Sequence, residues 1–128
     1  MKSSNLAQFD RQSFLNLETF RKNGAGVPTP VWFAEQDGVL YVRTIDGSGK
    51  VKRIRNNGRV RLAPCDARGG LKGEWVAGQA RIVSDPAEIE TANKLLTKKY
   101  GLQKRFLEWL NKRKKVVWAT IAAELVDA

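Results

Sequence analysis

The sequence predicts a mainly β protein, an antiparallel barrel with helices on its outside. Short runs of β-branched and aromatic residues recur along the chain, and glycine turns such as Asn23-Gly24 and Asp37-Gly38 separate them. Strands joined by tight turns pair antiparallel, and a C-terminal strand can close them into a barrel with the helices outside. The chain of 128 residues suits a single domain, residues 1–128, with a core of its own.

Six segments have the pattern of strands. The first begins at Ser13, and the Asn23-Gly24 turn predicts a hairpin after it. Pro28 and Pro30 predict that the second strand starts irregularly or lies at a sheet edge, because proline donates no hydrogen bond to a ladder. The strands after the first are expected at Thr29–Glu35, Val39–Ile45, Arg59–Cys65, Trp75–Val83 and Val117–Leu125.

Helical signals are fewer than strand signals. A short helix is expected after the turn at Asp46–Gly49, ending near Gly58. The clearest helix has Asp85 as its N-cap, Pro86 at its first position and Gly101 at its end. Residues 1–11 either form a short helix around Leu6–Asp10 or fray, and a last amphipathic segment is expected at Phe106, Trp109 and Leu110.

Composition excludes several kinds of site. The chain has no histidine and a single cysteine, so it cannot form a disulfide framework, a cysteine metal cluster or a histidine-based triad. No metal ligands are expected, and Cys65 is interpreted as a small buried hydrophobe. Tyr41, Glu35 and Asp66 are interpreted as structural, and catalytic residues stay unknown. If the protein is an enzyme, a bound cofactor must supply the demanding chemistry.

The chain is strongly basic, with a net charge of +10. This favours an anionic partner, which could be nucleic acid, a membrane surface or a polyanionic small molecule. The apolar runs are far shorter than the roughly 20 residues that span a membrane, and the N-terminus lacks the apolar core of a signal peptide. We therefore expect no membrane association and a cytoplasmic location.

The turn Asp46-Gly47-Ser48-Gly49 is the strongest local signal for binding. Its glycines free backbone N–H groups at the start of a helix, and Lys50, Lys52 and Arg53 add positive charge beside them. Such a helix start is a ready site for a phosphate group. The alternative interpretation is a solvated turn whose hydroxyl groups only cap the helix.

Several motifs together resemble one known family. In chain order they are TFRKNG, VPTPVWF, DGVLYVRT, SGKVKRIRNNGRVRLAPCDARG, WVAGQARIV and the helix end KKYG. They resemble the flavin and deazaflavin split-barrel family, the pyridoxamine 5′-phosphate oxidase-like group, and within it the small deazaflavin-dependent branch. The resemblance covers roughly residues 13–101, and the last strand is consistent with it.

The resemblance implies a six-stranded antiparallel split barrel that forms a homodimer with a flavin at the subunit interface. It implies that Thr44, Ser48 and Lys50 hold the cofactor phosphate. Gly49, whose turn frees backbone N–H groups, is predicted to bind the cofactor with them. Lys52 and Arg53 would reach the phosphate or a longer anionic tail. The backbone of Pro30, Val31 and Trp32 would lie along the isoalloxazine edge, and Arg68 and Trp75 would contact the flavin of the partner subunit.

The chain departs from pyridoxamine phosphate oxidases at two places. Those enzymes carry arginines where this chain has Thr29 and Gly49, and their C-terminal substrate-binding extension has no counterpart here. We therefore do not expect oxidation of pyridoxamine phosphate, and the substrate is an unidentified small organic molecule.

Three functions are compatible with the sequence. The leading hypothesis is an oxidoreductase that uses FMN, or alternatively a deazaflavin, and moves a hydride to or from its substrate. A flavin-binding or storage protein without turnover is the second hypothesis. A nucleic-acid-binding barrel is the third, and it comes last because no aromatic residues are interleaved with the basic cluster at Lys50–Arg61.

Overall fold

The computed structural model describes residues 4–101 and 117–126. Within them the chain forms three helices and seven strands. The helices are α1 (Ser4–Ala7), α2 (Gly49–Asn56) and α3 (Pro86–Tyr100). The strands are β1 (Phe14–Phe20), β2 (Gly26–Val31), β3 (Ala34–Gln36), β4 (Val39–Ile45), β5 (Arg59–Cys65), β6 (Val76–Ile82) and β7 (Trp118–Leu125).

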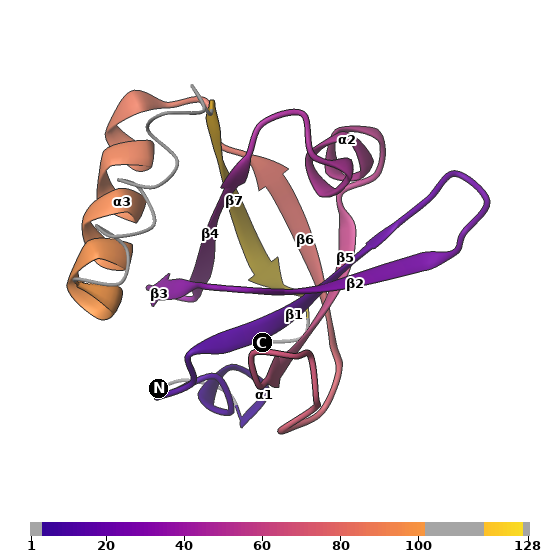
Figure 1. Cartoon of the computed structure of the whole chain (residues 1–128), viewed down its shortest axis with the longest axis horizontal. Coiled ribbons are helices and arrows are strands. Elements are labelled where there is room, and N and C mark those ends of the chain that lie inside the picture. The colour runs from indigo at the N-terminus through magenta and orange to yellow at the C-terminus, as the bar shows by residue number, and fades with distance from the viewer. Residues whose placement is uncertain (1–3, 102–116, 127–128) are drawn as a thin grey trace.

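All seven strands belong to one antiparallel sheet in the order β2-β1-β5-β6-β7-β4-β3. The sheet curls around a common interior, with the helices on its outside and at its ends (Figure 1). Its two edge strands, β2 and β3, follow each other directly along the chain. The antiparallel barrel prediction is therefore confirmed, as are the hairpin turns at Gly24 and Gly38, where φ is +90° and +85°.

The number of strands differs from the six expected. The segment Thr29–Glu35 was expected to form one strand, but it divides at Trp32 and Phe33 into β2 and β3. The division follows from pairing, because β2 pairs with β1 whereas β3 pairs with β4 at the other edge of the sheet. The chain must bend to pass between the two edges, and β2 does lie at an edge, as Pro28 and Pro30 predicted.

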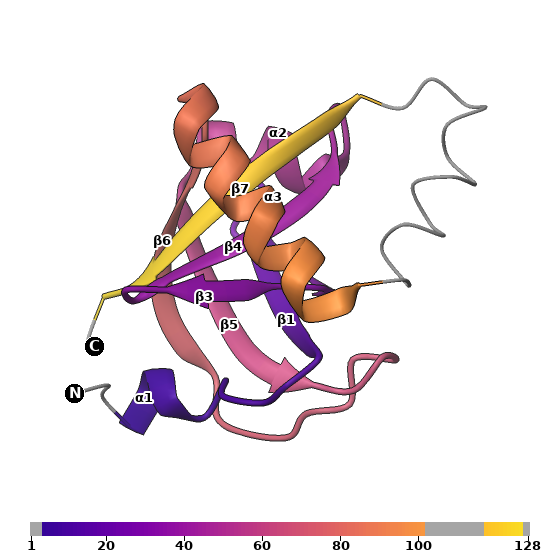
Figure 2. The same ribbon diagram turned by 90° about the vertical axis from the view of Figure 1, so that its left-hand side faces the viewer.

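The barrel interior is filled by alternate residues of the strands. Leu15, Leu40, Val60 and Ile121 are among the completely buried members of this core. The helix α2 adds Val51 and Ile54 at one end of the barrel, as expected. Leu6 of α1 and Phe9 just after it also belong to the core. The helix α1 lies at the end of the barrel opposite α2 (Figures 1 and 2). The N-terminal helix therefore forms, but it begins at Ser4 and ends at Ala7.

The helix α3 covers the outer face of β4 and β7 (Figure 2). Ala92 packs there with Tyr41 and Ala122 in a second apolar cluster. The Tyr41 hydroxyl donates to the Glu88 carboxylate at 2.8 Å. The strand Val39–Ile45 is thus covered on both faces, which explains why it is apolar at nearly every position.

The C-terminal turn of α3 holds the bend between β2 and β3. The Trp32 ring stacks on Tyr100, with 4.4 Å between centroids and 7° between planes. The Tyr100 hydroxyl accepts a hydrogen bond from the Phe33 N–H at 3.0 Å and donates to the Ser13 carbonyl at 2.7 Å. The Lys99 ammonium donates to the Phe33 carbonyl at 2.9 Å, and burial lowers the pKa of Lys99 to about 8.

Three further expectations can be compared with the structure. Asp85 accepts from the Ala87 N–H at 3.2 Å, and α3 ends at Gly101, as predicted. The expected segment around Phe106, Trp109 and Leu110 lies outside the described residues. None of the described helices is long and apolar enough to cross a membrane.

Replacing Tyr100 tests the role of this bend. Tyr100→Phe keeps the stacked ring but leaves the Phe33 N–H buried without its hydrogen-bond acceptor. We expect the free energy of unfolding to fall by about 1–3 kcal/mol, and the Tm to fall by roughly 4–10 °C. Thermal unfolding followed by circular dichroism measures this. Thr91→Ala on the exposed face of α3 is the control, and an equal Tm change in both variants would contradict the assignment.

Candidate functional site

The turn between β4 and α2 is shaped by local chemistry. Thr44 is buried at the end of β4, and the Ser48 N–H donates to the Ile45 carbonyl at 3.2 Å to close the turn. Gly47 has a φ of +85°, a conformation that L side chains rarely adopt. The helix α2 then begins at Gly49, so its first amides, which lack intrahelical partners, lie beside the turn.

Ser48 occupies the N-cap position of α2 without acting as a cap. Its backbone is extended, as an N-cap requires, but its side chain makes no capping hydrogen bond. The hydroxyl oxygen is buried and has no hydrogen-bond partner among the described residues. A buried hydroxyl without a partner costs free energy. The interpretation of a serine that only caps the helix is therefore wrong for Ser48, whose hydroxyl has an unused capacity for hydrogen bonding.

Two cations lie close to this helix start. Burial lowers the pKa of Lys50, and the positive charge of Arg53 lowers it further. A Cβ added to Gly49 would lie 2.6 Å from an Arg53 guanidinium nitrogen, so the glycine leaves room for that guanidinium. The Arg53 Nε also donates to the Thr19 hydroxyl at 2.6 Å, which fixes the side chain against β1. The helix start is therefore strongly positive.

The predicted phosphate-binding residues separate into two groups in the structure. Thr44, Ser48, Gly49 and Lys50 belong to the end of β4, the turn and the first residues of α2. Lys52 and Arg53 line a groove of about 520 Å³ between α2 and the β1–β2 hairpin. We call this feature the basic groove; its lining residues are Phe20, Arg21, Lys22, Lys52, Arg53, Asn56 and Asn57.

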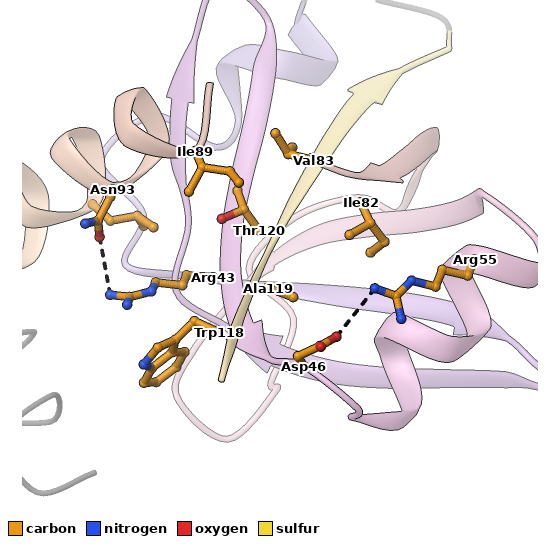
Figure 3. Close-up of a pocket in the computed structure, with 11 residues that line it drawn as sticks. Arg43, Asp46, Arg55, Ile82, Val83, Ile89, Asn93, Trp118, Ala119 and Thr120 are labelled. Carbon is orange, nitrogen blue, oxygen red and sulfur yellow. Dashed lines mark hydrogen bonds and ion pairs between the residues drawn. The ribbon is translucent and has the colours of Figure 1, made fainter. Parts of the chain in front are cut away.

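A smaller cavity of about 210 Å³ lies between α3, β4 and β7. Figure 3 shows Arg43 directed toward Asn93, a contact of 3.3 Å, and Arg55 directed toward Asp46, a contact of 3.5 Å. The Arg43 guanidinium also lies 4.5 Å from the centroid of the Trp118 ring. Sequence reasoning missed this cavity, because only the pairing of β4 with β7 places these residues together.

The segment predicted to lie along the isoalloxazine ends at the bend. Pro30 and Val31 are partly buried at the end of β2, an edge strand that pairs only with β1 in the described part of the chain. Phe33 is the core residue of this segment, with 1% exposure. The Trp32 ring already stacks on Tyr100, so the backbone here, rather than the indole, is what a planar ligand could meet.

The residues expected to contact the flavin of a partner subunit lie apart from the turn. Arg68 is exposed in the loop after β5, and its N–H donates to the Asp66 carboxylate at 2.8 Å. Trp75 is partly buried, with the Arg61 guanidinium 4.8 Å from the centroid of its ring.

The candidate proton donors and acceptors are engaged in structural contacts. Tyr41 donates to Glu88, and Glu35 accepts from the Gly38 N–H at 2.9 Å. Asp66 accepts from the N–H groups of its own loop, and these hydrogen bonds lower its pKa. Cys65 has 1% exposure, and burial raises the pKa of its thiol. The thiol therefore stays neutral, as expected of a small buried hydrophobe. These contacts agree with the structural interpretation of the four residues.

Comparisons with solved structures identify the same fold in several proteins. The haem storage protein HutZ of Vibrio cholerae has a TM-score of 0.64 and 12% identity, covering 93% of this chain and 85% of that one. An F420 reductase has a TM-score of 0.60 and 19% identity, with coverages of 98% and 96%. An FAD-binding protein of Mesorhizobium loti has a TM-score of 0.62 and 18% identity, with coverages of 94% and 83%.

A search of curated proteins finds no match to the sequence. The family comparison, in contrast, covers nearly the whole chain. The sequence profile of the pyridoxamine 5′-phosphate oxidase family matches residues 3–125, which include every described strand. The chain therefore belongs to the pyridoxamine 5′-phosphate oxidase family.

Proposed function

We propose that the protein is a homodimeric flavin-dependent oxidoreductase whose cofactor phosphate binds at the start of α2. Thr44, Ser48, Gly49 and Lys50 would hold that phosphate. The observation that carries the proposal is the buried Ser48 hydroxyl, which has no partner in the described part of the chain and lies beside free helix amides, in a chain of this family. A phosphate oxygen would accept hydrogen bonds from both the hydroxyl and the amides.

The electrostatics of the turn support an anionic ligand. Burial removes water from Lys50 and lowers its pKa, and Arg53 is close enough to lower that pKa further. A phosphate between them would offset both effects and form short, charge-assisted hydrogen bonds. The electrostatic support for a phosphate at this turn therefore comes from this chain's own residues and does not depend on its relatives.

FMN is the proposed cofactor, with a deazaflavin as the alternative. The F420 reductase and the FAD-binding protein of similar fold support a flavin-like cofactor without choosing between them. Lys52 and Arg53 both lie about one turn along α2 from Gly49, within reach of a longer anionic tail. A bound flavin would supply the hydride chemistry, and the chain would bind it, orient it and limit its contact with water.

We propose a small organic substrate that is different from pyridoxamine phosphate. Thr29 and Gly49 stand where pyridoxamine phosphate oxidases carry arginines. We also propose that the protein acts in the cytoplasm, where a free thiol such as Cys65 is stable.

The second candidate function is flavin binding or storage without turnover. Its support is that Tyr41, Glu35 and Asp66 are all held in structural hydrogen bonds. The fold neighbour HutZ, a haem storage protein, gives an example of this fold in a protein described as a store.

The phosphate site is tested with FMN and with riboflavin, which lacks the phosphate. We expect Ser48→Ala and Lys50→Ala each to weaken FMN binding by roughly 10- to 100-fold, because each removes a hydrogen bond to a charged group. Riboflavin affinity should stay within about twofold. Fluorescence titration of the flavin measures both affinities. Equal losses for the two ligands would show that the phosphate does not bind here.

Matched controls separate binding from folding. Ser84→Ala and Lys98→Ala remove the same groups from exposed positions beside and on α3, and neither should change FMN affinity. Ser48→Ala should leave the stability of the cofactor-free protein equal or slightly higher, because it removes a buried polar atom without a partner. A clear loss of stability would show that the hydroxyl has a structural partner.

The pH dependence of FMN binding tests Lys50 directly. Burial and Arg53 lower the pKa of Lys50 in the free protein, and a bound phosphate raises that pKa, because it favours the ammonium form. FMN affinity should therefore decline with rising alkaline pH, starting below the ordinary lysine value of about 10.4. Lys50→Arg is the control, since arginine stays charged and its affinity should not decline in that range. A decline of the same size in both proteins would exclude Lys50 as its source.

Turnover and assembly are tested on the flavin-loaded protein. An oxidoreductase should transfer electrons from a reduced nicotinamide donor, so the visible flavin absorbance should bleach within seconds to minutes; a storage protein should stay oxidised. Sedimentation velocity should give a mass near twice the 14.3 kDa of one chain. A monomer that retains FMN would contradict the interface location of the cofactor.

A further inference from the structure

The basic groove between α2 and the β1–β2 hairpin concentrates positive charge at a second place on the barrel. Four of its seven lining residues are cationic and none is acidic: Arg21, Lys22, Lys52 and Arg53. They come from two chain segments about thirty residues apart, and Figure 1 shows that the fold brings the hairpin beside α2. Like charges held together repel, so the groove favours a polyanion.

Two cations of the groove have no carboxylate partner among the described residues. No ion pair joins a carboxylate to Arg21 or Lys22 there. Arg55, Arg61 and Arg81 lie outside the groove, and each forms an ion pair with a carboxylate, at 3.5, 2.6 and 2.7 Å. Arg21 and Lys22 therefore keep positive charge that ion pairs offset at these three arginines.

The groove is also preorganised. Gly49, Lys52, Arg53 and Asn56 are spaced at i, i+3, i+4 and i+7, so they share one face of α2. The hydrogen bond of 2.6 Å from Arg53 to the Thr19 hydroxyl fixes one of the cations before any ligand arrives. Ordering this side chain in advance reduces the entropy lost on binding.

The uncharged residues and the size of the groove limit the chemical classes of ligand that it suits. Asn56 and Asn57 supply side-chain amides, and Phe20 supplies an aromatic ring, with the Arg59 guanidinium 4.9 Å from its centroid. A volume of about 520 Å³ is that of a small-molecule site. It accommodates one nucleotide with its phosphates, whereas a nucleic-acid strand requires a longer track of cations.

We propose that the basic groove binds a nucleoside diphosphate group. Arg21, Lys22, Lys52 and Arg53 hold its two phosphates, and Phe20 with the asparagines contacts the nucleoside. Because the two phosphates of FAD include the flavin phosphate that we place at Ser48, the ligand is a separate adenine nucleotide, such as the ADP portion of a nicotinamide donor. The groove shares Arg53 with the phosphate site, but its other lining residues are different, so the proposal goes beyond the proposed function and its test on Arg21 and Lys22 can fail or hold independently of it.

The test is calorimetric titration of the full chain, without flavin, with ADP. The groove variant is Arg21→Ala combined with Lys22→Ala, two exposed residues of the hairpin. The control variant is Lys72→Ala combined with Lys98→Ala, which removes the same charge from exposed positions outside the groove. We expect a Kd for ADP below about 1 mM and a loss of about tenfold or more in the groove variant only.

Three outcomes would overturn the proposal. The first is no heat of binding with millimolar ADP, and the second is an equal loss of affinity in the groove and control variants. The third is binding of a ten-nucleotide oligothymidylate that millimolar ADP does not displace, which would assign the groove to nucleic acid instead. Circular dichroism of both variants confirms that their folds are intact before the affinities are compared.

Competition identifies the nucleotide. If ADP binds in the presence of saturating FMN and competes with NADPH, the groove holds the nicotinamide donor, as proposed. If FMN displaces ADP, the nucleotide occupies the flavin phosphate site, which would also overturn the proposal. Failure of FMN to bind, with ADP binding retained, would reject the flavin proposal and leave this one standing.

Discussion

The passage of the chain from one edge of the sheet to the other is the constraint on which the barrel depends. Consecutive strands β2 and β3 pair at opposite edges, so the two residues between them must leave both ladders. Their backbone groups then need other partners. The Tyr100 hydroxyl accepts from the Phe33 N–H, and the Lys99 ammonium donates to the Phe33 carbonyl. These two hydrogen bonds connect α3 to the bend. Through this connection, a helix late in the chain determines where the early strands separate.

The position of the candidate site follows from this arrangement. Once β3 lies at the far edge, β4 runs back between β3 and β7, and its end carries Thr44 to the barrel end that α2 closes. Val51 and Ile54 bury one face of α2 in that end. Its other faces can therefore carry charged side chains. For this reason a helix of eight residues contributes cations both to the turn at its start and to the basic groove.

Local patterns were sufficient for the parts of the structure that are locally determined. The turn glycines, the Asp85 cap and the serine–lysine turn could all be predicted, because each depends on residues adjacent in sequence. The break at Trp32 and Phe33 could not, because aromatic residues favour strands and no turn residue marks the break, so only the pairing with β1 and β4 divides the segment. The same limit applies to the groove. No local pattern connects Arg21 with Lys52, so Phe20 was not recognised as the aromatic neighbour of the basic cluster.

The unfavourable features of this protein are concentrated around one helix. The Ser48 hydroxyl is buried without a partner among the described residues, burial and Arg53 disfavour the charge of Lys50, and Arg21 and Lys22 lie beside further cations. Such arrangements are expected to cost the free chain stability, whereas Arg61 and Arg81 are paired with carboxylates. A sequence selected only for folding would remove such conflicts, since single substitutions suffice. Phosphate groups bound at the two proposed sites would relieve all three conflicts, and this shared effect is the physical argument for proposing that α2 is organised around anionic ligands.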